Sequence, residues 1–212
     1  MHWLRRPWRA TPREAGADEP EEPEEKRETP PLRERSAPGI EALFAGLRED
    51  GSHAILDLGP AAGSSFRLYS RFARRIRFAD LLNAPTRGEG WAKALQSLSR
   101  DPEHPYDLVL AWNLLDRVPP RGRSLVVESL ARLTTSGARL YVVVDVSGDP
   151  TPRPLRFTLL GLDRVGQQPV GDPYPALPQL LPAKVERLLH PFRVEHGFTL
   201  KLGHREYVAV RR

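Results

Sequence analysis

The sequence predicts an α/β fold, with a doubly wound, mainly parallel sheet, helices on both faces and an antiparallel hairpin at the C-terminal end. Short apolar runs of strand length alternate with helical periodicity over residues 54–146. This alternation favours βα units, in which a parallel sheet is covered on both faces. Two further strand-like runs, residues 197–202 and 206–210, are separated by a short turn that contains glycine, and they predict the hairpin.

Four strands are predicted before the hairpin. Each is a short run rich in aliphatic or aromatic residues, the composition that favours a buried strand. The four runs are residues 54–58, 75–79, 107–112 and 138–146.

Five helices are predicted from apolar residues that recur at three- and four-residue spacing. The predicted helices cover residues 40–47, 64–74, 91–98, 121–133 and 183–189. In the second helix we expect Phe66, Tyr69 and Phe72 to point inward. Gly137 is expected to stop the fourth helix, as a glycine after a helix end does.

Chain length and composition suit one globular domain with a solvated extension. The 212 residues are 40% hydrophobic and 28% charged, and a typical domain has about 100–200 residues. Residues 1–38 contain seven prolines and an acidic run at residues 18–25, so we expect a disordered N-terminal arm. The folded domain is expected to span residues 39–212. The arm is either a plain solvated extension or a tail that binds a protein partner through Trp3, Leu4 and Trp8.

A proline-rich segment follows the last predicted parallel strand. Nine prolines lie between residues 150 and 191. Because proline breaks helices and cannot donate a hydrogen bond to a sheet, we expect residues 150–182 to form an irregular insertion or lid.

The composition excludes several classes of protein. The chain has no cysteine, which rules out disulfide scaffolds, thiolate nucleophiles and cysteine-bound metal centres. Its longest apolar runs are about five residues, as at residues 140–144, whereas a membrane span needs about 20. The first thirty residues lack the apolar core of a secretory signal, so we expect a cytoplasmic protein that does not enter a membrane.

Charge and histidine spacing point to neither nucleic acid nor a metal. The net charge of +5 comes with 28 arginines but only four lysines, scattered without a basic stripe. A nucleic-acid partner is therefore not indicated. The six histidines show no metal-ligand spacing, so no metal site is expected.

The most informative segment is residues 55–65, where an apolar strand leads into a turn with Gly59 and Gly63 and then into a helix. In an open α/β sheet such a turn lies at the carboxyl edge, where ligands bind near the switch in strand order. A dinucleotide fingerprint would need glycines where Ala61 and Ser64 stand, and no phosphate-loop lysine follows the turn. The turn therefore favours a ligand that does not depend on phosphate contacts.

The residues Asp57-x-Gly59-x-Ala61-x-Gly63 resemble the first motif of the class I S-adenosylmethionine-dependent methyltransferases, which have a Rossmann-like sheet. The family motif has an acidic residue followed by three alternating glycines, and alanine replaces the middle glycine here. Asp80 ends the next predicted strand, seventeen residues beyond Gly63. The family places at this point a carboxylate that accepts both ribose hydroxyls, a task that suits an acceptor-only group.

Two later segments are similar to the same family. Residues 106–118 match its fourth-strand segment, with Asn113 at the polar tip, and residues 133–140 match its passage from a helix through glycine into the fifth strand. Asp116 and Arg117 stand where many small-molecule members have two histidines. If the reaction needs a base, Asp116 is the nearest candidate.

One family element is poorly represented. Only 26 residues separate Asp80 from Asp107, and the most periodic part of them predicts a helix. We therefore expect the family's third strand to be vestigial. Glu89 and Asp101 are the candidates for the acid that approaches the adenine amino group.

The resemblance implies S-adenosyl-L-methionine as the cofactor and a small molecule as the methyl acceptor. The implied cofactor-binding residues are Asp57, Gly59, Gly63, Asp80 and Asn113, and the implied catalytic residue is Asp116. Each has a plainer alternative, since the glycines could serve only the turn, Asp57 could accept only loop amides, and Asp80 could be a surface carboxylate. The alternative function is a non-catalytic relative that serves as a binding or scaffolding protein.

Overall fold

A computed structural model describes residues 30–82, 90–98, 104–174, 176–201 and 203–212. Within them, six strands form one sheet in the order β3-β2-β4-β5-β9-β8. Their bounds are β2 (His53–Asp57), β3 (Ala73–Phe78), β4 (Tyr106–Trp112), β5 (Thr134–Asp145), β8 (Phe192–Thr199) and β9 (His204–Arg211).

The directions of the strands divide the sheet into two parts. Strands β3, β2, β4 and β5 are parallel, and β9 runs antiparallel to both β5 and β8. The predicted C-terminal hairpin is therefore present as β8 and β9. Among the described residues β3 lies at the edge, so no third family strand is seen beyond it.

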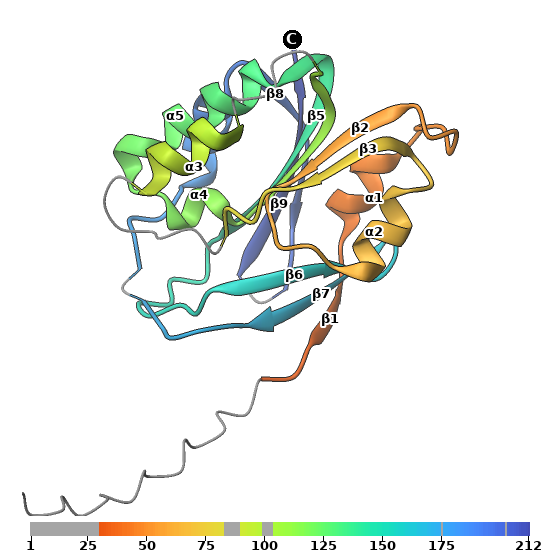
Figure 1. Cartoon of the computed structure of the whole chain (residues 1–212). Coiled ribbons are helices and arrows are strands. Elements are labelled where there is room, and N and C mark those ends of the chain that lie inside the picture. Colours follow the sequence, from red (N-terminus) through yellow and green to blue (C-terminus); the bar gives the residue numbers. More distant parts are fainter. Residues whose placement is uncertain (1–29, 83–89, 99–103, 175, 202) are drawn as a thin grey trace, which may run out of the picture.

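Helices cover both faces of this sheet, which confirms the predicted fold class. The helices α1 (Pro38–Phe44) and α2 (Gly63–Tyr69) lie on one face, and α3 (Gly90–Leu98) and α5 (Pro120–Arg132) lie on the other (Figure 1). The helix α6 (Pro182–Leu189) packs against α5 and β8, and the short helix α4 (Leu114–Arg117) follows β4.

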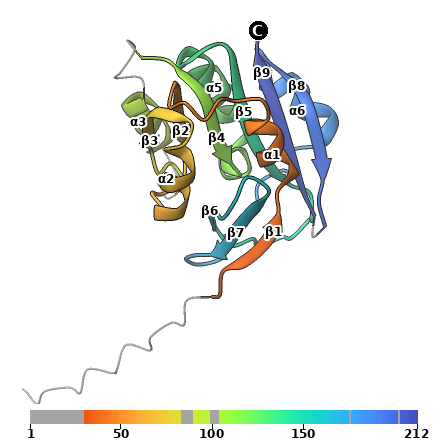
Figure 2. The ribbon, with the colours of Figure 1, turned by 90° about the vertical axis from the view of Figure 1, so that its right-hand side faces the viewer.

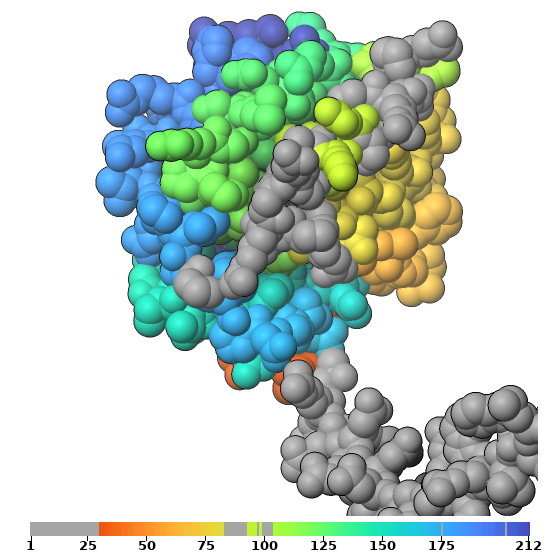
Figure 3. All heavy atoms as spheres, turned by 60° about the vertical axis from the view of Figure 1, so that its left-hand side comes forward, coloured from red at the N-terminus to blue at the C-terminus, as the bar shows by residue number. Residues whose placement is uncertain are grey.

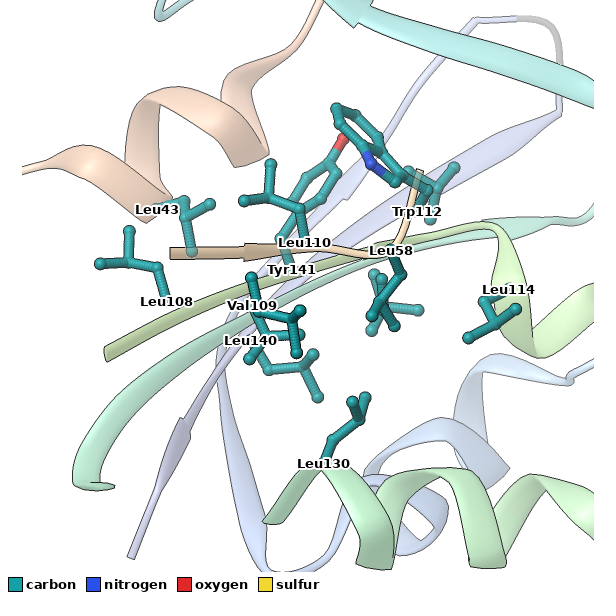
Figure 4. Packing of buried hydrophobic residues seen from close by; sticks show 14 of the residues in the cluster. Leu43, Leu58, Leu108, Val109, Leu110, Trp112, Leu114, Leu130, Leu140 and Tyr141 are labelled. Atoms are coloured by element: carbon teal, nitrogen blue, oxygen red, sulfur yellow. The ribbon is translucent and has the colours of Figure 1, made fainter. Parts of the chain in front are cut away.

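The core follows from the two-residue alternation of the central strands. Leu108 and Leu110 point toward α1, whereas Val109 points toward Leu130 of α5 (Figure 4). These side chains are at most 1% exposed. Because both faces of β4 are buried, the strand is an almost unbroken apolar run rather than an alternating one.

A second, smaller sheet crosses the carboxyl edge of the large one. Its strands are β1 (Arg33–Ser36), β7 (Arg164–Pro169) and β6 (Leu155–Leu159), and all its pairings are antiparallel (Figures 1 and 2). The insertion predicted to be irregular therefore contains an ordered hairpin. Residues 33–36, expected in the disordered arm, form an edge strand of this sheet. The rest of the predicted arm, residues 1–29, lies outside the described residues.

Two local predictions about the helices were wrong. Phe66 is 52% exposed because the buried face of α2 carries Ser65, Leu68 and Tyr69 instead. Gly137 does not cap a helix, since α5 already ends at Arg132. It lies inside β5 with a φ of +80°, a conformation that favours glycine.

Candidate functional site

The strand order places a switch point between β2 and β4. The chain leaves β2 through α2 toward β3, then returns past β2 to β4 by way of α3 on the other face. At such a point the connections after neighbouring strands diverge and leave a crevice beyond the carboxyl ends of the strands. The side chains at the tips of β2, β3, β4 and β5 are therefore the candidate site residues.

Asp57, at the end of β2, accepts hydrogen bonds from three groups of the protein. Its Oδ1 accepts hydrogen bonds from Gly59 N at 2.8 Å and Trp112 Nε1 at 2.6 Å, and its Oδ2 accepts one from Tyr69 Oη at 2.7 Å. The residue is only 2% exposed. Burial raises the pKa of Asp57 to about 6, and the three hydrogen bonds oppose this shift. Asp57 thus ties the loop after β2 to β4 and α2.

The two glycines of the turn have different surroundings. A Cβ on Gly59 would lie 3.1 Å from Asp57 Oδ1 and 3.2 Å from Trp112 Nε1, so this position needs glycine for close internal packing. A Cβ on Gly63 would have no atom of the described residues within 4 Å, apart from its chain neighbours and its own helix backbone. Gly63 begins α2 and is exposed, as is Ala61. Among the described residues, the outer part of the turn therefore faces open space.

Asp80 follows β3 and lies beside this turn. Its backbone N–H donates to the carbonyl oxygen of Gly59 at 3.2 Å, and Ala79 N donates to Asp57 O at 2.8 Å. Asp80 is exposed and has a φ of +46°, a conformation that Asp and Asn tolerate better than most residues. The structure therefore places Asp80 and the glycine turn side by side, the arrangement that the family resemblance implies.

Trp112 belongs to the core rather than to an open surface. Its ring is 1% exposed, stacks on Phe157 of β6 at 5.0 Å between centroids, and meets the edge of Tyr141 at 5.5 Å. The indole also donates to Asp57 Oδ1. Trp112 therefore connects the loop after β2 with the small sheet, a long-range contact that no local pattern in the sequence indicates.

A pocket lies at the tips of β4 and β5, beneath the insertion. Asn113, Asp116, Asp145 and Asp149 line it, together with Tyr174 of the insertion. Figure 3 shows the insertion residues, in cyan to light blue, along one edge of the molecule below the green residues of α5.

Two of these residues were predicted to be functional. Asn113 is 5% exposed, and its Oδ1 has no hydrogen-bond partner among the described residues. Asp116 accepts the backbone N–H of Asp145 at 2.8 Å. Burial raises the pKa of Asp116 to about 7, the Asp145 carboxylate adds to the shift, and the positive charges of Arg123 and Arg117 reduce it.

Two arginines attach the insertion to the domain. Arg117 donates to the carbonyl oxygens of Leu82 and Leu155, the latter at 2.8 Å. Arg123 donates to Val118 O at 3.0 Å and to Pro178 O at 2.8 Å. No local pattern in the sequence predicts this role for Arg117, because its carbonyl partners are distant in the chain.

The predicted site residues fall into two groups. Asp57, Gly59, Gly63 and Asp80 gather at the tips of β2 and β3, whereas Asn113 lies with Asp116 at the tips of β4 and β5. The candidates for the adenine contact, Glu89 and Asp101, lie outside the described residues. Among the described residues, no group of three or more His, Asp or Glu side chains could hold a metal ion. No helix there has the length and apolar character needed to cross a bilayer.

No family model and no curated protein matches the sequence. Solved structures of similar fold do match. One similar structure is the 1,6-didemethyltoxoflavin-N1-methyltransferase of Burkholderia thailandensis, solved with 1,6-didemethyltoxoflavin and S-adenosylhomocysteine. It is 17% identical, with a TM-score of 0.52, over 82% of this chain and 76% of the other. A second is DhpI in complex with SAH, also 17% identical, with a TM-score of 0.50, over 82% of this chain and 83% of the other.

These similarities agree with the strand order and the helix layers described above. The chain therefore has the Rossmann-like fold of the S-adenosylmethionine-dependent class I methyltransferases.

Proposed function

We propose that the protein is an S-adenosylmethionine-dependent methyltransferase that acts on a small molecule. The observation that carries this proposal is the position of Asp80 beside the Gly59 turn, at the switch point of a methyltransferase fold. The two similar structures were both solved with SAH, which supports the same cofactor here.

The residues at the tips of β2 and β3 fit such a cofactor. Asp80 is exposed and its carboxylate can accept hydrogen bonds from both hydroxyls of a ribose. The turn at Gly63 leaves room among the described residues. Asn113, which the resemblance also implies as a cofactor contact, lies instead with Asp116 in the pocket at the tips of β4 and β5. Asp57 would not contact the cofactor directly. Its carboxylate accepts three hydrogen bonds from the protein and so holds the turn in place.

The bound cofactor would supply a methyl group on a sulfonium, which is already an excellent leaving group. The protein therefore has to align the acceptor and exclude water, and alignment alone contributes up to about 7–11 kcal/mol in well-oriented systems. Asp116 would accept a proton from the acceptor, since its raised pKa suits a base at neutral pH. The insertion would exclude water, because Arg117 and Arg123 attach it over the pocket.

Isothermal titration with S-adenosylhomocysteine tests the proposal. We expect the wild-type protein to bind it and the Asp80→Asn variant to bind it about tenfold more weakly, through the loss of a charged acceptor. Asparagine also tolerates the positive φ at this position, so the fold should persist. Asp163→Asn is the matched control, because Asp163 is exposed in the turn between β6 and β7. A wild-type protein that gives neither heat nor a thermal shift with S-adenosylhomocysteine would contradict the proposal.

A further inference from the structure

We propose that the pocket at the tips of β4 and β5 binds the amino group of a small amine with an apolar body, and that this nitrogen is the methyl acceptor. The inference rests on the proposed function and specifies its substrate class. It is drawn from the acceptor atoms that line the pocket, from their charge and from the apolar side chains around them.

Several lining residues of the pocket carry hydrogen-bond acceptors. Asp116, Asp145, Asp149 and Asn113 are among them. Asn113 is only 5% exposed, and its Oδ1 has no hydrogen-bond partner among the described residues. A buried amide oxygen without a donor is costly, so it points to a ligand that brings N–H groups.

The charges of the pocket favour a cation over an anion. The ionisable lining residues are three aspartates, the two arginines Arg123 and Arg153, and His204, so the carboxylates outnumber the guanidinium groups. The guanidinium of Arg123 already donates to the carbonyl oxygens of Val118 and Pro178, and Arg153 is exposed. A ligand carboxylate would therefore meet like charges, whereas an ammonium group would meet opposite ones.

Most of the other lining residues come from the insertion. Besides Arg153 and Gln179 they are aliphatic side chains, prolines and one tyrosine ring, which are Pro152, Leu155, Tyr174, Ala176, Leu177 and Pro178. Such a lining suits the hydrocarbon body of an amine, because ligand sites combine apolar walls with a few polar groups that fix orientation.

Asp116 is the residue that we assign to proton removal. An ammonium nitrogen has no lone pair and cannot attack carbon. One of its N–H bonds breaks, the electron pair stays on nitrogen, and the proton goes to the Asp116 carboxylate, which becomes a neutral acid. The amine nitrogen then bonds to the methyl carbon while the carbon–sulfur bond breaks, with its electron pair going to sulfur.

The surroundings of Asp116 support this transfer. Burial and the charge of Asp145 raise the pKa of Asp116 to about 7, while Arg123 and Arg117 act in the opposite direction. Tyr174 also faces this group, and burial raises the pKa of its phenol, so it stays neutral near pH 7. Asp116 can therefore both hold and release a proton near neutral pH.

The test is a binding titration with ligands that share a body and differ in the polar group. The probes are benzylamine, benzyl alcohol and phenylacetate, followed at matched ionic strength by calorimetry and by the side-chain amide resonance of Asn113. Each titration is run with and without S-adenosylhomocysteine. We expect benzylamine to bind and to shift the Asn113 resonance, and phenylacetate to do neither.

Three variants assign the binding to the pocket. Asp116→Asn and Asp145→Asn each remove one pocket carboxylate but keep an amide oxygen that can accept the same backbone N–H, from Asp145 and Ser147 respectively. We expect each to weaken benzylamine binding about tenfold, the effect of losing one charged hydrogen-bond partner. Asp163→Asn removes an exposed carboxylate of the insertion and should leave the binding unchanged.

Two results would overturn the inference. One is a protein that binds S-adenosylhomocysteine but binds phenylacetate as well as benzylamine, or binds neither. The other is unchanged benzylamine affinity in both pocket variants, with thermal denaturation showing that they fold. Failure to bind S-adenosylhomocysteine alone would instead contradict the proposed function, so the two failures are distinguishable.

Discussion

Asp57 and Asp116 are two aspartates at the same edge of the sheet with opposite hydrogen-bond environments. Both have a pKa raised by burial, to about 6 and about 7. Asp57 accepts hydrogen bonds from three donors of the protein, whereas Asp116 accepts a backbone N–H and also lines a pocket. In both aspartates the raised pKa reports burial. Their hydrogen-bond partners then indicate whether the carboxylate has a structural or a catalytic role.

The largest effect is expected from Asp57→Ala. The variant leaves Gly59 N, Trp112 Nε1 and Tyr69 Oη without their acceptor in a buried region. Each unpaired buried donor costs about 1–3 kcal/mol, so the free energy of unfolding should fall by about 4 kcal/mol or more. Urea denaturation measures this change. Asp163→Ala, an exposed aspartate, should change it by less than about 0.5 kcal/mol. Equal losses in the two variants would show that the Asp57 network is not structural.

The next largest effect is a dependence of stability on pH. The native state holds protons on Asp57 and Asp116 at pH values where the unfolded state has released them. Their contribution to stability is therefore full below about pH 4, and it is lost as pH rises through about 6 for Asp57 and about 7 for Asp116. For Asp57 the loss is about 3 kcal/mol, since one pKa unit is worth about 1.4 kcal/mol.

The Asp57→Asn variant isolates this contribution. Asparagine does not titrate, so the fall in unfolding free energy that ends near pH 6 should disappear, and the part that extends to about pH 7 should persist. Urea denaturation at several pH values from 4 to 8 makes the comparison. If wild type and variant show the same pH profile, Asp57 is ionised throughout and the pKa assignment is wrong.

The sequence predicted the part of the site that depends on local order along the chain. The apolar runs of β2, β4 and β5 identified the parallel sheet, and the resemblance to the methyltransferase motif implied that Asp80 belongs to the same site as the glycine turn. The sequence left two roles open for Asp57, contact with the cofactor or acceptance of internal hydrogen bonds. Two of its three donors, Tyr69 and Trp112, are distant in the chain, and no sequence pattern shows that they lie close to Asp57. The structure favours the reading in which it accepts internal donors.

The small sheet shows why the rest could not be predicted. Strand β1 is Arg33–Ser36, four polar residues with no apolar alternation, and β7 ends at a proline. Strand β1 lies at the edge of the small sheet, and its backbone groups pair with those of the central strand β7. Backbone pairing of this kind leaves no mark in the pattern of side chains. Phe157 of β6 is buried against Trp112, but only the folded structure brings the two rings together.

Arg117→Met tests the link between the insertion and the pocket. The variant keeps most of the side-chain volume but leaves the carbonyl oxygens of Leu82 and Leu155 without a donor. We expect a loss of about 2 kcal/mol and faster hydrogen exchange in β6 and β7. Arg156→Met is the control, because Arg156 is exposed on the same strand as Leu155. Unchanged exchange in β6 would show that the insertion is held by other contacts.

The smallest effects separate the two glycines of the turn. Gly59→Ala places a methyl group against Asp57 Oδ1 and Trp112 Nε1, and we expect it to destabilise the protein by about 1–2 kcal/mol. Apart from its chain neighbours and its own helix backbone, Gly63→Ala meets no atom of the described residues within 4 Å, and it lies at the start of a helix, so stability should stay equal or rise by up to about 1 kcal/mol.

At Gly63 the affinity for S-adenosylhomocysteine should fall although the stability does not. If the open space there belongs to the cofactor, the added methyl group enters it, and Gly63→Ala should bind S-adenosylhomocysteine severalfold more weakly although the protein is as stable as wild type. Calorimetry and thermal denaturation on the same samples make this comparison. Full affinity in a stable Gly63→Ala variant would show that Gly63 serves only the turn, and the cofactor would then have to be held by Asp80 without the outer part of the motif.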